Sequence, residues 1–136
     1  MKDWIFFTIL TLLLWGFWSF LPKVVVRYID PYSAMVYQAI GGILVGLGVL
    51  IAFKSQLAFN LPGFSLGIVI GLFGFLGAFT YMLAVSKGPL VLVAPLSALY
   101  PVLAILMSVV FLHEAVTLKQ GIGIAFSLAA IYFIST

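Results

Sequence analysis

The chain has 136 residues, of which 65% are hydrophobic and only 7% are charged, with six basic residues against three acidic ones. A soluble domain carries about 25% charged residues, and one of this size cannot hide so much apolar surface from water. The composition therefore excludes a soluble enzyme, a nucleic-acid-binding protein and a disordered chain, and it indicates an integral membrane protein. The chain has no cysteine, which excludes disulfides and thiolate metal sites.

The first predicted membrane helix covers residues 4–21, where an apolar run of about the length needed to span a bilayer precedes Pro22, Lys23 and Arg27. The run continues through Trp15 and Trp18 without a small-residue cleavage site. We therefore interpret it as a retained membrane helix rather than a cleaved signal peptide.

The next two predicted helices cover residues 31–53 and 62–86. The first of them has a clear start, because Asp30 can cap it and Pro31 fits the first helical position. The second ends before Lys87-Gly88-Pro89, a stop followed by a new start.

The last two predicted helices cover residues 90–112 and 117–133. His113 and Glu114 separate them, and Thr117 with Gln120 forms a capping box that opens the final helix. The sequence thus predicts an all-α membrane protein with five transmembrane helices in a single domain over residues 1–136. With five spans, the two termini lie on opposite sides of the membrane.

Two helix faces carry patterns typical of packing and bending. Gly67, Gly71 and Gly74 form a small-residue stripe that lets helix backbones approach closely. Pro95 and Pro101 fall in one predicted span, and each removes a backbone donor, so neighbouring protein or water must satisfy the freed carbonyls. We predict that these prolines let the fourth helix bend.

Several polar and aromatic positions have two readings. Trp15 and Trp18 share a face and either anchor the helix at the membrane interface or line a cavity. Gln38 lies about two turns into its span and either lines a cavity or bonds across helices. Lys23 either snorkels outward or lies at a cavity mouth.

No ionisable residue falls near the middle of a predicted span, and the sequence contains no nucleophile–base pair, metal cluster or phosphate loop. We therefore expect no enzyme activity, no cofactor and no metal. Intramembrane ionisable groups are costly and are kept for function, so their absence favours facilitated transport or exchange over proton symport.

An ordered set of motifs resembles one five-helix EamA unit of the drug/metabolite transporter superfamily, over nearly the whole chain. The set is Trp15-Gly16, Lys23, Pro31, Gln38, Tyr81-x-x-Ala84-x-x-x-Gly88, Pro101, His113-Glu114 and Thr117-x-x-Gln120-Gly121. The resemblance implies half of a ten-helix fold made of two inverted units, with a solute site near the midplane lined by the first, third and fourth helices. The chain departs from the family in having one unit, and in having Gln38 where many relatives carry Arg.

The predicted function is therefore a transporter of small metabolites, amino-acid-like or amphipathic, that works by alternating access. The basic residues divide three against three between the two sides, Lys2, Lys54 and Lys119 opposite Lys23, Arg27 and Lys87. This balance favours neither orientation. Because the two units of the family are inverted, the resemblance implies that a lone unit inserts both ways and pairs as an antiparallel homodimer. Trp15, Trp18, Gln38, Tyr81, Ser97 and Tyr100 are the candidate lining residues.

The family also implies a multi-pass protein in the plasma (inner) membrane of a prokaryote, whose partners are a small-molecule solute, the lipid bilayer and a second copy, with no nucleic acid. Two alternatives stay open. A non-transporting subunit of a larger membrane protein would need packing stripes but no cavity. A lipid flippase would need a lateral opening that the sequence does not reveal.

Overall fold

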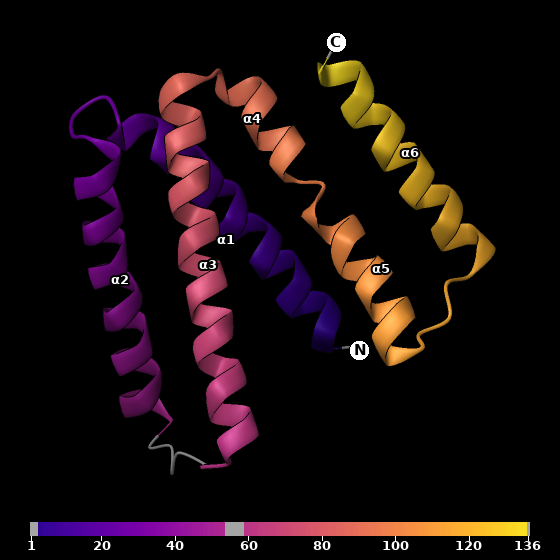
Figure 1. Cartoon of the computed structure of the whole chain (residues 1–136), viewed down its shortest axis with the longest axis horizontal. Coiled ribbons are helices and arrows are strands. Elements are labelled where there is room, and N and C mark those ends of the chain that lie inside the picture. Colours follow the sequence, from indigo (N-terminus) through magenta and orange to yellow (C-terminus); the bar gives the residue numbers. More distant parts are fainter. Residues whose placement is uncertain (1–2, 54–58, 136) are drawn as a thin grey trace. The chain divides into compact units, whose positions relative to one another are not determined.

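The computed structural model describes residues 3–53 and 59–135 (Figure 1). The described residues form helices and no strand, which confirms the predicted all-α membrane protein. The helices are α1 (Asp3–Val25), α2 (Pro31–Ala52), α3 (Leu61–Lys87), α4 (Leu90–Ser97), α5 (Tyr100–Leu112) and α6 (Leu118–Ser135). Four stretches are long and apolar enough to cross a membrane: Trp4–Val25, Pro31–Ala52, Leu61–Lys87, and Leu90–Leu112, which contains both α4 and α5.

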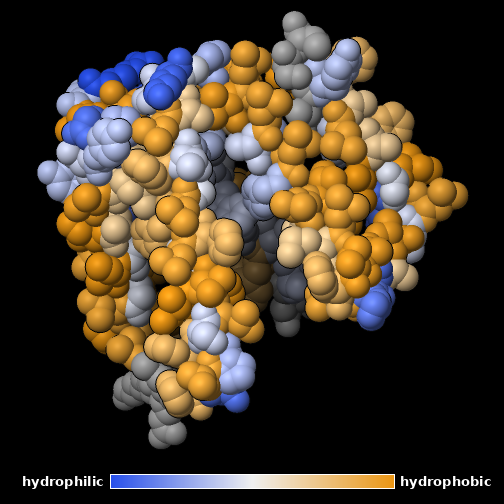
Figure 2. All heavy atoms as spheres, in the orientation of Figure 1, coloured by the Kyte–Doolittle hydropathy of each residue, from blue (hydrophilic) through white to orange (hydrophobic). Residues whose placement is uncertain are grey.

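The chain divides into two compact units, Met1–Lys87 with α1 to α3 and Gly88–Thr136 with α4 to α6. Apolar side chains cover most of the visible surface (Figure 2), and many are largely exposed, such as Phe17 at 71% and Phe133 at 76%. A surface of this kind is compatible with lipid as the surrounding solvent and not with water.

The core of the first unit lies at one end of its three helices. There α3 packs against both α1 and α2, where α1 ends, α2 begins and α3 ends. The buried residues are Pro22, Ala34, Ala78, Tyr81, Met82 and Val85. By contrast, every α1 residue from Trp4 to Trp18 is exposed, and α1 diverges from α3 toward its N-terminal end (Figure 1). α1 is thus joined to α3 at one end only.

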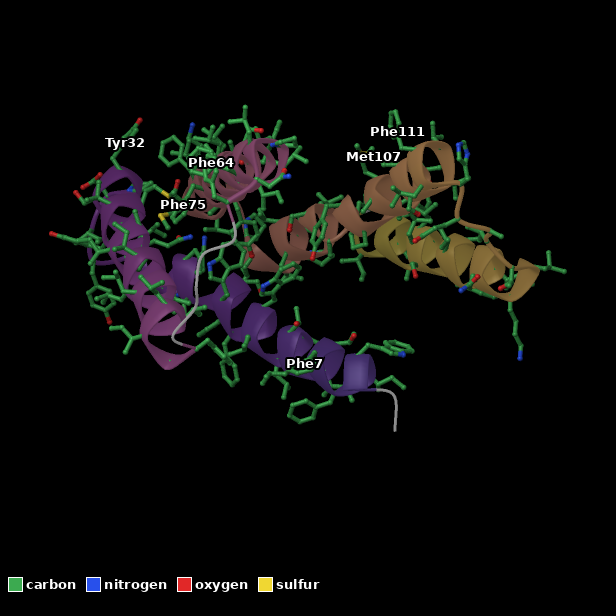
Figure 3. All side chains as sticks on the ribbon, turned by 90° about the horizontal axis from the view of Figure 1, so that it is seen from below. Phe7, Tyr32, Phe64, Phe75, Met107 and Phe111 are labelled. Atoms are coloured by element: carbon green, nitrogen blue, oxygen red, sulfur yellow. The ribbon has the colours of Figure 1, made fainter. Side chains whose placement is uncertain are left out.

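The α2–α3 packing depends on a close approach at Gly42. A Cβ added to Gly42 would lie 2.9 Å from Cζ of Phe75, which extends from α3 toward α2 (Figure 3). The rings of Tyr32 and Phe79 lie 5.8 Å apart nearer the core. The predicted stripe of Gly67, Gly71 and Gly74 makes no such close approach to a neighbouring helix in the described residues.

A Cβ added to any residue of that glycine stripe would meet nothing within 4 Å in the described part of the chain. The stripe therefore leaves an open strip of α3 backbone rather than forming the α2–α3 contact. Its role in helix packing stays a prediction.

The predicted caps are confirmed. Oδ1 of Asp30 accepts hydrogen bonds from the backbone N–H groups of Tyr32 and Ser33, at 2.9 and 3.0 Å, at the start of α2. At the start of α6, Oε1 of Gln120 accepts a hydrogen bond from the Thr117 N–H, and Oγ1 of Thr117 accepts one from the Gln120 N–H. Each cap satisfies donors that the first helical turn leaves unpaired.

The Asp30 cap makes the stability of α2 depend on pH. The hydrogen bond that the Ser33 hydroxyl donates, followed by the Ser33 backbone N–H, lowers the pKa of Asp30 below its ordinary value of 3.8. A carboxyl whose pKa is lower in the folded state stabilises the fold above the unfolded pKa, and that contribution is lost as the pH falls through the folded pKa. We expect the thermal midpoint to fall below about pH 4 in the wild type.

Asp30→Asn is the matched control, because an amide oxygen still accepts the cap hydrogen bonds but does not titrate. The midpoint of this variant, measured against pH, is expected to lack the Asp30 part of the acid-induced decrease. Identical acid profiles for the two proteins would contradict the prediction.

In the second unit, α4 packs against α6, and the predicted continuous helix over residues 90–112 is instead broken at Ala98 and Leu99. The break has a local cause, because Pro95 and Pro101 on either side of it lack the N–H groups that would continue the hydrogen-bond ladder. At the far end of α5, His113 adopts a left-handed conformation with φ of 55°, and the helix stops.

Candidate functional site

Two predicted site residues, Trp18 of α1 and Tyr81 of α3, meet at the end of the first unit where its buried core lies. We call this end the closed end. Their rings stack with centroids 5.5 Å apart and planes 28° apart. Tyr81 is only 8% exposed, and its hydroxyl donates a hydrogen bond of 2.8 Å to the backbone carbonyl of Ser19. A buried tyrosine needs such a partner for its hydroxyl. The stacked pair and its hydrogen bond join α1 to α3.

Pro22 lies in the same stretch of α1 as this contact. The structure continues α1 to Val25, one turn beyond the predicted end, so Pro22 lies inside the helix. Its ring removes the N–H that would bond to the Trp18 carbonyl and disturbs the preceding turn. Tyr81 thus supplies a hydrogen bond from α3 to α1 in the turn that the proline weakens.

Lys23 lies on the other side of Pro22. Its Nζ donates a hydrogen bond of 2.7 Å to the backbone carbonyl of Val85, which is among the last carbonyls of α3. The final turn of a helix leaves carbonyls unpaired and carries partial negative charge, so an ammonium group there is stabilising. We define the α1–α3 clasp as Trp18, Ser19, Lys23, Tyr81 and Val85. A role for Lys23 at a cavity mouth stays a prediction.

Gln38 lies at the border between the closed end and the exposed halves of the helices. It is half-buried and shares a face of α2 with Ala34, which is buried, and with Gly42, which Phe75 contacts. Its amide forms no hydrogen bond with any other residue that the structure describes. The amide therefore has its donors and acceptor available, beside the α2–α3 packing.

Trp15 lies one turn before the clasp and is 55% exposed. A shallow apolar depression of about 380 Å³ lies along α1 next to it, lined by Leu12, Leu13, Gly16, Phe17 and Phe20. Its lining contains no polar side chain that could orient a solute. The depression suits a lipid chain better than a polar metabolite, and Trp15 is not part of its lining.

Ser97 and Tyr100 belong to the second unit and lie on either side of the α4–α5 break. The Ser97 hydroxyl donates a hydrogen bond of 2.9 Å to the carbonyl of Ala94, and Tyr100 begins α5 with half of its surface exposed. Pro95 and Pro101 lie in the same stretch. Four of the predicted functional residues therefore gather at this break.

Sequence reasoning missed the carbonyls of Ser19 and Val85. These acceptors belong to the backbone, and no residue type marks them. Asp30, His113 and Glu114 lie outside the described helices. The described residues contain no cluster of three or more potential metal ligands.

The sequence profile of the EamA-like transporter family matches residues 2–136. An uncharacterized protein of Methanocaldococcus jannaschii is 27% identical over 127 residues, which make up 93% of this chain and 92% of that protein. No solved structure matches the chain significantly. Because the family profile extends over nearly the whole chain, and because its helices are long and apolar enough to cross a membrane, the chain is a multi-pass membrane protein that belongs to the EamA-like transporter family.

Proposed function

We propose that the chain carries small metabolites, amino-acid-like or amphipathic, by alternating access as an antiparallel homodimer in the plasma membrane of a prokaryote. The observation that carries this proposal is the match of residues 2–136 to a transporter family. The first unit is asymmetric, because α1 and α3 are joined at one end and exposed at the other, and this asymmetry suits such a mechanism.

Alternating access requires one gate on each side of a central solute site. A single chain supplies one closed end, the α1–α3 clasp. A second copy inserted in the opposite orientation would place its own clasp at the other side of the membrane. The balance of three basic residues against three supports both orientations.

The proposed solute site combines aromatic faces with uncharged polar groups. Its lining residues are Trp15, Trp18, Gln38, Tyr81, Ser97 and Tyr100. A pocket of this kind binds the apolar body of a solute on the rings and orients it through a few amide and hydroxyl groups. Because the middle of each described span lacks an ionisable group, we propose facilitated transport or exchange.

The function is tested by counterflow in proteoliposomes without a pH gradient. The solute is chosen by a thermal-shift screen of amino acids and amphipathic amines, since binding to the folded state raises its stability. We expect labelled solute to accumulate transiently against unlabelled solute. Absence of counterflow for every stabilising solute would contradict the carrier function.

Trp15→Ala tests the aromatic part of the site. We expect about a five-fold loss of apparent affinity, the scale of one aromatic contact. Trp4→Ala is the matched control, because Trp4 lies at the N-terminal end of α1 and is 62% exposed. Unchanged affinity in Trp15→Ala would remove Trp15 from the site.

A further inference from the structure

The α4–α5 break lies inside the stretch Leu90–Leu112, which is 23 residues long and apolar enough to cross a membrane. Two residues, Ala98 and Leu99, separate the helices, about nine residues from one end of the stretch. The break therefore falls well inside the hydrocarbon region. Irregular backbone at that depth is tolerated only where protein or a polar cavity satisfies it.

The two prolines leave carbonyls without donors. Pro95 has no N–H for the carbonyl of Val91, and Pro101 has none for the carbonyl of Ser97. Both losses follow from the sequence alone.

The structure shows two further carbonyls without a helical donor, because the backbone changes its hydrogen-bond register at the break. The N–H of Leu99 donates to the carbonyl of Leu96 at 3.3 Å instead of reaching back to Pro95. The N–H of Val102 donates to the carbonyl of Leu99 at 3.0 Å instead of reaching Ala98. Both are bonds to the third residue back, so the carbonyls of Pro95 and Ala98 lose their helical donors.

The residues that carry three of these carbonyls lie on one side of α4 and its C-cap. Val91, Pro95 and Ala98 are spaced by four and three residues, the repeat that places helical positions above one another. Val91 is 74% exposed, Ala98 is exposed as well, and Pro95 between them is half-buried, so the second unit covers this face only in part. We define this set as the carbonyl face.

We infer that the carbonyl face binds the primary ammonium group of the transported solute. The inference rests on the proposed carrier function. Carbonyl oxygens only accept hydrogen bonds, and the C-terminal end of α4 adds the negative end of the helix dipole. An ammonium group supplies three donors and a positive charge.

The candidate membrane spans offer no competing anion for such a group. The four candidate membrane spans contain no Asp and no Glu. Within these spans a cationic group is therefore stabilised by backbone dipoles, hydroxyls and aromatic rings rather than by a carboxylate. The Ser97 hydroxyl stands at the same break, beside the carbonyl face. A partly unwound helix is a recurrent way to build a cation site at mid-membrane.

The test compares two probes of matched shape in calorimetry on the purified full chain. Phenethylamine carries a primary ammonium group, and 2-phenylethanol replaces it with a hydroxyl. We expect phenethylamine to bind at least about ten-fold more tightly, the scale of a charge-assisted hydrogen bond. Phenethyltrimethylammonium, which keeps the charge and loses the donors, should bind with an intermediate affinity. Equal affinity for the amine and the alcohol would overturn the inference.

Pro95→Ala with Pro101→Ala restores both missing N–H groups and is expected to reduce the preference for the amine to less than about three-fold. Circular dichroism checks that this variant remains helical. Pro62→Ala is the matched control, since Pro62 lies in the first turn of α3, where its N–H has no helical acceptor. A full amine preference in the folded double variant would also overturn the inference.

The stability of the protein in sodium chloride, compared with its stability in choline chloride, separates an ammonium site from a metal-ion site. Stabilisation by Na⁺ without any response to phenethylamine would overturn the ammonium assignment. The outcome is independent of the counterflow assay. An amine preference without counterflow would support the ammonium site and contradict the carrier function. Counterflow of solutes without any amine preference would support the carrier function and contradict the ammonium site.

Discussion

Replacing Tyr81 with alanine is expected to lower the free energy of unfolding by about 2–3 kcal/mol in detergent and to release α1 from α3. Lipid and detergent tails are as apolar as the protein interior, so the ordinary gain from removing a ring from water largely cancels. What remains is the lost packing of a side chain that is 92% buried and stacked on Trp18, together with the hydrogen bond to the Ser19 carbonyl.

Tyr81→Phe separates these two parts, because it keeps the ring and removes only the hydroxyl. Its expected cost is about 1 kcal/mol, the usual value of one hydrogen bond. Thermal unfolding followed by tryptophan emission measures both variants, since Trp18 reports directly on the contact. Equal midpoints for the wild type and Tyr81→Ala would show that the clasp does not hold α1 to α3.

Two added lysines in the loop after α2, Ser55→Lys with Gln56→Lys, are expected to reduce transport about ten-fold or more. Both positions lie outside the described residues, but their side of the membrane follows from the order of the spans. The change shifts the balance from three against three to five against three, which fixes one orientation. If the working form is an antiparallel pair, a population with one orientation cannot build it.

The matched control is Ser55→Asp with Gln56→Glu, because acidic residues contribute little to orientation. Reporters at the C-terminus should appear on both sides of the membrane for the wild type and for this control, and on one side for the lysine variant. Co-expression with an oppositely biased chain, Tyr28→Lys with Ser86→Lys, should restore transport. One-sided reporters on a transporting wild-type chain would rule out the antiparallel homodimer.

Features encoded by a few neighbouring residues could be predicted from the sequence. Asp30 and Thr117 with Gln120 mark helix starts because a cap joins side chains to backbone groups only three residues away. The apolar runs predict membrane helices because each run is long enough to span a bilayer. Pro95 and Pro101 predict that the fourth helix bends. The position of the break at Ala98 and Leu99 depends on a change in the backbone hydrogen-bond register, which residue types do not encode.

The α1–α3 clasp lay beyond such reasoning. The sequence predicts Trp18 and Tyr81 as lining residues, and it does not predict that their rings stack or that the tyrosine hydroxyl donates to a carbonyl 62 residues earlier in the chain. The charge of Lys23 predicts that its side chain snorkels outward or lies at a cavity mouth, but it does not predict the hydrogen bond to the backbone carbonyl of Val85. Tertiary contacts to the backbone carry no signature in a single sequence.

The length of α3 has a consequence for the surrounding bilayer. Its 27 residues extend about 40 Å, whereas the hydrocarbon region is about 30 Å thick. A helix with this surplus tilts, and a thinner bilayer makes it tilt further. Because the clasp fixes only the C-terminal end of α3 to α1, a change in tilt moves the free halves of the two helices relative to one another. We therefore expect the distance between the free halves of α1 and α3 to change with the acyl-chain length of the surrounding lipid.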